Sequence, residues 1–243
     1  MSAETRHWLL RIGSVAAILG SLCAAVGNIL HPVTPRDDPE GVARVIADSS
    51  AWTLIHFVIV IGIILMLGGI VAIRYTIEGG AAEAFARLGV YAATIGATVG
   101  VITLILDGVA AKQLADVWAA APEPGKAIAL SAVSANETIN FALAGLFNFS
   151  FAGVPFVLLG LAVGRSGTYR PWLGWVGALA GVGSIGASLV QAFNGRPTTA
   201  SLILTIIGPT VISLWLLVLG VLLGRTAAAL ASDDRGRAGA VVD

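Results

Sequence analysis

Long apolar runs, separated by short polar stretches, make up most of the chain. Six runs stand out: Trp8–Leu30, Trp52–Ile73, Leu88–Ala110, Thr138–Val163, Trp172–Phe193 and Ala200–Gly224. Each is about as long as an α-helix must be to cross the hydrocarbon core of a bilayer, roughly 20 residues. The pattern predicts an all-α, polytopic membrane helix bundle of about six transmembrane helices joined by short loops. No strand-like alternation competes with this interpretation.

The polar stretches predict only minor structure outside the membrane. Residues 41–48 have the pattern of a short amphipathic helix behind a proline-rich segment. A second short helix is predicted at Ala111–Ala121, and it ends before Pro122 and Pro124. Residues 1–225 then form a single transmembrane domain, and residues 226–243, polar and small, are expected to be a flexible cytoplasmic tail.

Composition agrees with this organisation and narrows the function. The chain has 243 residues, 57% hydrophobic and 12% charged, whereas soluble domains are about a quarter charged. Six spans leave no length for a separate catalytic domain. The net charge is zero, which does not suggest nucleic-acid binding. The single cysteine, Cys23, lies in the first apolar run, so it forms no disulfide framework.

Basic residues predict the orientation of the spans. A six-span arrangement puts nine of them on one side, Arg6, Arg11, Arg74, Arg87, Arg165, Arg170, Arg225, Arg235 and Arg237, and five on the other, Arg36, Arg44, Lys112, Lys126 and Arg196. The positive-inside rule then places both termini in the cytoplasm. The excess of Arg over Lys is typical of a GC-rich bacterial genome. The membrane is therefore expected to be a bacterial cytoplasmic membrane. As an alternative, the first run is a signal peptide cleaved near Ala25-Val26-Gly27.

Small residues recur at helical spacing within the runs. Gly96/Gly100, Gly177/Gly181 and Gly220/Gly224 are four apart, and Gly13, Gly20 and Gly27 are seven apart. Such spacing allows helix backbones to approach closely, either inside one bundle or at the face of a homo-oligomer. Pro155 and the pair Gly208-Pro209 are expected to bend their helices.

Polar side chains gather at one height near the outer membrane surface. With a rise of ~1.5 Å per residue, His31, His56, Asp107, Gln191 and Asn194 fall at about 26–33 Å from the inner end, and Glu137 and Asn140 at roughly 35–39 Å. Asn148 continues the stripe of Glu137 and Asn140, and Ser184 and Ser188 continue that of Gln191. These residues predict a polar cavity facing the bundle interior. The alternative is interfacial side chains solvated by lipid headgroups.

Two kinds of cofactor fit these residue types. His31, His56, Asp107 and Glu137 offer the imidazole and carboxylate ligands that zinc and related metals use. His31 and His56 also offer the axial pair for a haem. Because no HExxH motif, serine elbow or other known ligand spacing occurs, the sequence predicts neither cofactor and no catalytic residue.

Several stretches resemble an uncharacterised group of six-helix, multi-pass membrane proteins common in actinobacteria. They are His31-Pro32, Trp52 with His56, Asp107–Ala115 running on to Trp118, Ala121 and Pro122, and Trp172–Trp175. The resemblance covers most of the chain and implies a membrane protein without implying an activity.

Three functions remain open. The first is an accessory or small-molecule-binding membrane component whose polar cavity lies near the outer face. A small-molecule or proton-coupled transporter is the second, although no inverted repeat or pair of broken helices supports it. The third is a metal-dependent membrane enzyme at the outer leaflet. Besides the lipid bilayer, the expected partner is a small ligand.

Overall fold

The structure, a computed structural model, describes residues 1–35, 37–195 and 198–239; Arg36 and Arg196, counted above, lie outside them. Within these residues six helical segments are long and apolar enough to cross a membrane: Glu4–Leu30, Trp52–Arg74, Gly80–Ala120, Gly125–Arg165, Pro171–Asn194 and Ile203–Ala231. The predicted all-α membrane helix bundle is thereby confirmed.

Six helices form a closed ring in chain order. They are α1 (Ala3–Leu30), α3 (Trp52–Arg74), α4 (Gly80–Ile105), α7 (Val154–Arg165), α8 (Pro171–Asn194) and α9 (Thr199–Gly239). Each packs against the next, and α9 returns to pack against α1. Both termini lie at the same end of the bundle, called the inner end here, as an even number of spans requires.

Close packing inside the ring depends on the predicted small residues. A Cβ added at Gly20 would lie 2.6 Å from the Met66 nitrogen, and one added at Gly96 would lie 2.2 Å from the Ser150 oxygen. The other predicted glycines likewise meet neighbouring helices of the same chain. The glycine faces are therefore filled by helices of the same chain, which is the first of the two alternatives above. Association of two chains through such faces stays a prediction.

Two of the spans are longer than expected. α4 continues through a π-helical segment, η1 (Leu106–Ala111), into α5 (Lys112–Ala120); α6 (Gly125–Phe147) continues through a second, η2 (Asn148–Gly153), into α7. Each composite span has 41 residues, or about 60 Å at 1.5 Å per residue, twice the thickness of the hydrocarbon core. The loops are short, as expected, but the spans extend further than the apolar runs, because polar residues after Ala111 and before Thr138 continue the helices.

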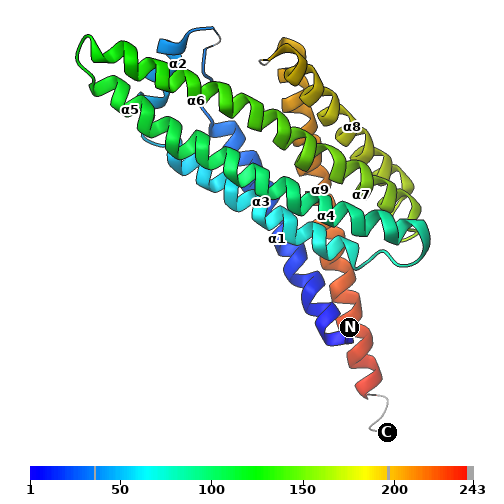
Figure 1. The fold of residues 1–243 in the computed structure, drawn as a ribbon. Helices are drawn as coiled ribbons and strands as arrows, with labels where there is room; N and C mark the ends of the chain where they lie inside the picture. The colour runs from blue at the N-terminus through cyan, green and yellow to red at the C-terminus, as the bar shows by residue number, and fades with distance from the viewer. Residues whose placement is uncertain (36, 196–197, 240–243) are drawn as a thin grey trace.

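The protruding ends form a helical cap with α2 (Pro39–Asp48), seen at the upper left of Figure 1. The Asp38 side chain accepts a hydrogen bond from the Gly41 N–H and caps α2. The buried face of α2 packs in two small clusters: Val42 and Ile46 with Trp52, Ala111 and Ala115, and Ala43 with Trp118 and Val133. The short amphipathic helix is confirmed, whereas the short helix expected at 111–121 is the unbroken continuation of α4.

The prolines and the C-terminal segment agree with the prediction in part. Pro155 is the second residue of α7, just after η2, and a bend there stays a prediction. Pro209 lies inside α9, which continues through it, and a bend there stays a prediction. α9 reaches Gly239 and so includes most of residues 226–243, whose flexibility also stays a prediction.

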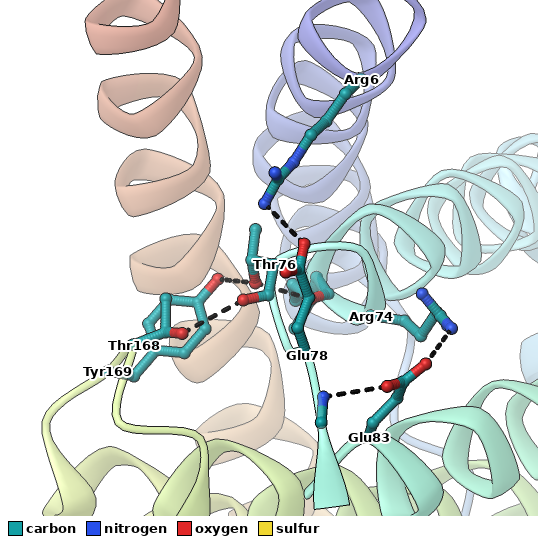
Figure 2. A network of polar contacts seen from close by, with 9 residues as sticks. Arg6, Arg74, Thr76, Glu78, Glu83, Thr168 and Tyr169 are labelled. Carbon is teal, nitrogen blue, oxygen red and sulfur yellow. Dashed lines mark hydrogen bonds and ion pairs between the residues drawn. The ribbon is translucent and has the colours of Figure 1, made fainter. Parts of the chain in front are cut away.

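At the inner end, two loops hold the helix ends together (Figure 2). Thr76, after α3, bonds to the Tyr169 hydroxyl at 2.7 Å, and the Thr168 hydroxyl donates to the Thr76 carbonyl at 3.1 Å. Arg6 of α1 pairs with Glu78 at 3.1 Å, and Arg74 pairs with Glu83 at 2.9 Å. Burial raises the pKa of the Tyr169 hydroxyl, which therefore stays a donor at neutral pH. The inner ends of α1, α3, α4 and α7 are thus joined by polar contacts.

Candidate functional site

His31 is placed by the proline that follows it. A residue before proline is pushed out of the α-helical region, and His31 accordingly ends α1 with φ −66° and ψ 122°. Its Nδ1 lies 2.9 Å from the Pro32 carbonyl oxygen. A carbonyl only accepts hydrogen bonds, so Nδ1 carries the proton and the neutral ring keeps a lone pair on Nε2.

His56 lies one turn inside α3 and is 1% exposed. Its Nδ1 lies 2.7 Å from the Trp52 carbonyl oxygen one turn earlier, so the same tautomer follows and its Nε2 also has a free lone pair. The Trp52 indole contacts both imidazoles, with ring centroids 4.8 Å from His31 and 5.0 Å from His56. Trp52 therefore fixes the orientation of both rings.

Asp107 belongs to the π-helical segment η1, which side chains of α3 hold in place. The Trp52 indole N–H donates to the Asp107 carbonyl at 2.8 Å, and the Thr53 hydroxyl donates to the Gly108 carbonyl at 2.8 Å. A Cβ added at Gly108 would lie 2.3 Å from the His56 Cβ, so only glycine allows η1 to approach α3 this closely. The space that the missing side chain of Gly108 leaves is filled by His56.

Three metal-ligand side chains from three helical segments meet here. His31 Nε2 lies 3.3 Å from His56 Nε2, and His56 Nε2 lies 3.2 Å from an Asp107 carboxylate oxygen. The ligand atoms all lie within 4.8 Å of one another. Both imidazole nitrogens and the carboxylate oxygen carry lone pairs, so the arrangement calls for a cation between them. That cation is either a shared proton or a metal ion.

The surroundings favour the neutral form of His31 and leave the cluster accessible. Burial lowers the pKa of His31, and the neighbouring His56 lowers it further, against smaller opposite effects of Asp107 and the Pro32 carbonyl. A neutral imidazole is the form that binds a metal. The Asp107 side chain remains 21% exposed, which leaves one side of the cluster open to solvent.

Glu137 and Asn140 lie on the adjacent face of α6 without joining the cluster. Glu137 is close enough to Asp107 for their charges to interact, yet it is not among the residues whose ligand atoms converge. Asn140 is buried with its Oδ1 unpaired in the described part of the chain. Asn136, which the sequence analysis missed, is buried one turn away with its Nδ2 unpaired. Its spacing of four from Asn140 was the signal that identifies it.

Gln191 and Asn194 lie apart from the histidines. Gln191 is buried and donates to the Phe141 carbonyl of α6, while Asn194 is exposed and donates to the Val190 carbonyl of its own helix. Ser188 donates to the Gly145 carbonyl at 2.7 Å. The predicted stripe on α8 therefore faces the bundle interior but joins α8 to α6.

The imidazoles of the cluster are closely packed on one side, and a polar cavity around the cluster stays a prediction. Two hollows, of about 300 and 160 Å³, lie at the inner end, around Glu83 and Arg87 and around Gly160 and Trp175. Trp52 occupies the space beside both imidazoles. The two histidine rings are in direct contact, 4.9 Å between centroids, so the plane of a porphyrin does not fit between them.

Fold and site together define a polytopic helical membrane protein with a His–His–Asp cluster where its cap meets the spanning helices. The chain belongs to the family described as "Domain of unknown function (DUF4386)", which matches residues 8–220. Comparison with curated proteins and with solved structures gives no match. The expectation of an uncharacterised membrane-protein family is confirmed, and an actinobacterial origin stays a prediction.

Proposed function

We propose that this membrane protein binds a divalent first-row transition-metal ion, of which zinc is representative, through His31, His56 and Asp107. The observation that carries the proposal is that three atoms with lone pairs converge: Nε2 of His31, Nε2 of His56 and a carboxylate oxygen of Asp107. Both histidines carry their proton on Nδ1, because each Nδ1 faces a backbone carbonyl oxygen. The protein then belongs to the binding class among the functions weighed above.

The spacing of the atoms supports a metal. Two ligands at the usual ~2.0–2.1 Å from a tetrahedral zinc ion stand roughly 3.3 Å apart, which matches the two distances from His56 Nε2, 3.3 Å to His31 Nε2 and 3.2 Å to the Asp107 carboxylate oxygen. The three ligand atoms lie within 4.8 Å of one another, so His31 and Asp107 would move closer together around an ion. Two imidazoles and one carboxylate form a nitrogen and oxygen set that suits zinc and iron(II). The remaining positions are free for water.

The contacts behind the ligands also support a metal. Metal-binding histidines usually donate their second N–H to a carboxylate or a backbone carbonyl, and both histidines do so, to Pro32 and to Trp52. A set of three protein ligands with open positions is typical of zinc sites that exchange water or bind another molecule, whereas structural sites have four.

Zinc titration of the purified protein tests the proposal. The chain has only three histidines and one cysteine, so background binding is low provided that the affinity tag contains no histidine. We expect the protein to bind one zinc ion per chain, measured by its competition with a chelating indicator. Binding should also change the tryptophan fluorescence, because Trp52 touches both imidazoles.

The proposal would be wrong if the protein bound no stoichiometric zinc, iron(II) or cobalt(II) between pH 7 and pH 8. The cation between the three side chains would then be a shared proton. The fluorescence change should disappear in Trp52→Phe and persist in Trp175→Phe, whose indole lies at the inner end. Equal loss in both variants would locate the bound zinc elsewhere.

We further propose a bacterial cytoplasmic membrane with both termini in the cytoplasm, supported by the nine-to-five distribution of basic residues. In a Cys23→Ala background, an impermeant thiol reagent added to intact cells should label cysteines placed at Ser50 and Glu123, in the cap. It should not label a cysteine at Glu78, in the inner loop. Labelling of Glu78→Cys alone would reverse the orientation.

A further inference from the structure

A hollow of about 160 Å³ opens between α7 and α8 at the inner end, lined by Gly160, Leu161, Gly164, Arg165 and Trp175. The two glycines contribute no side chain to it. Trp175 is 57% exposed and forms one wall. The hollow is therefore a groove on the outer surface of the helix ring, where lipid surrounds a membrane protein.

Arg165 differs from most of the arginines near it because no acidic side chain neutralises it. Arg6, Arg74 and Arg87 each form an ion pair with Glu78 or Glu83. Among the described residues no ion pair involves Arg165, whose guanidinium lies 5.6 Å from the centre of the Phe85 ring. An exposed guanidinium at the end of the groove is free to receive an anion.

The tryptophans place the groove at the depth of the lipid headgroups. Trp172 and Trp175, each 57% exposed, lie in the first turns of α8, and Arg165 ends α7. Tryptophan is enriched where hydrocarbon meets headgroups. The acyl-chain side of the groove is therefore apolar, and its cationic end lies at the level of the phosphates.

We infer that this groove binds one anionic phospholipid of the inner leaflet. The lipid phosphate would accept charge-assisted hydrogen bonds from Arg165, and an acyl chain would lie along Leu161 and Gly164 against Trp175. Basic hollows between transmembrane helices on the cytoplasmic side suit such headgroups. The site is distinct from the metal cluster, which lies at the opposite end of the bundle.

Native mass spectrometry and thermal unfolding test the site on the full-length protein. Phosphatidylglycerol added to protein in phosphatidylcholine nanodiscs should remain bound as one molecule per chain and raise the melting temperature. Arg165→Gln should weaken phosphatidylglycerol binding roughly tenfold, the effect of losing one charge-assisted hydrogen bond. Gly164→Leu, which keeps the charge but fills the groove, should weaken binding as well.

Arg225→Gln is the matched control, because Arg225 is exposed at the same end on α9 and does not line the groove. Equal weakening by Arg165→Gln and Arg225→Gln would reduce the effect to general surface charge and overturn the inference. Retention of phosphatidylcholine as tightly as phosphatidylglycerol would also overturn it. So would full competition by soluble glycerol phosphate, which would make the ligand a free phosphate ester.

Discussion

Replacing His56 by alanine is expected to weaken zinc binding at least a hundredfold. Even residues behind metal ligands alter affinity 10- to 100-fold, and His56 is the ligand that touches both of the others. Asp107→Asn and His31→Ala should each produce a loss of similar size. Competition with a chelating indicator measures the affinity of each purified variant.

The third histidine supplies the matched control for this prediction. His7 lies at the inner end, where its Nδ1 is 3.1 Å from the Ala227 carbonyl oxygen. His7→Ala should therefore leave zinc affinity unchanged. The double variant His56→Ala/Asp107→Asn should bind zinc no more weakly than His56→Ala alone, because residues sharing one ion are not additive. Losses that add, or an equal loss in His7→Ala, would contradict a three-ligand site.

Replacing Gly20 by leucine is expected to destabilise the bundle by about 3 kcal/mol, the upper range for an overpacked core. The backbone of α3 lies where the new side chain would start, with the Met66 nitrogen at 2.6 Å and the Gly62 oxygen at 2.8 Å. Backbone atoms cannot rotate away, so α1 would have to move. The melting temperature should fall by roughly 6–12 °C.

Gly186→Leu is the matched control, because it makes the same substitution at a glycine where an added Cβ contacts no neighbouring helix. Gly186 lies in α8, and an added Cβ there meets nothing within 4 Å. Its melting temperature should change by less than about 2 °C, as for surface substitutions. If Gly20→Leu fails to fold, Gly20→Ala should show an intermediate loss. Similar melting temperatures for the Gly20 and Gly186 variants would exclude tight packing of α1 on α3.

The helices and the histidine cluster were predictable for different reasons. A backbone in hydrocarbon must satisfy its own hydrogen bonds, so apolar length alone predicts the spans. The rise per residue put His31, His56 and Asp107 at one height, and the structure brings their side chains together. Height does not determine which helices are neighbours. Gln191 and Asn194 matched in height but lie on α8, which packs mainly against α7 and α9, so they are apart from the cluster.

Other features had no signal in hydropathy. A π-helical turn has the same composition as an α-helical one, so η1 and η2 could not be located from the pattern of apolar residues. The cap was missed because residues 125–137 carry Lys126, Ser131, Ser134 and Glu137, which lower the hydropathy without opposing helix formation. Their helix is stabilised by tertiary contacts with α2 and α5.

The closure of the ring by α9 bears on how the protein assembles during synthesis. α1 is the first span to leave the ribosome, yet one of its two neighbours is the last. Until α9 arrives, the Ser14 hydroxyl lacks the Gly220 carbonyl that it bonds at 2.7 Å, and the α1 surface that receives Gly220 and Gly224 faces lipid. Insertion of the earlier spans therefore yields an open arc of helices. A chain that ends before α9 leaves the Ser14 hydroxyl without this carbonyl partner.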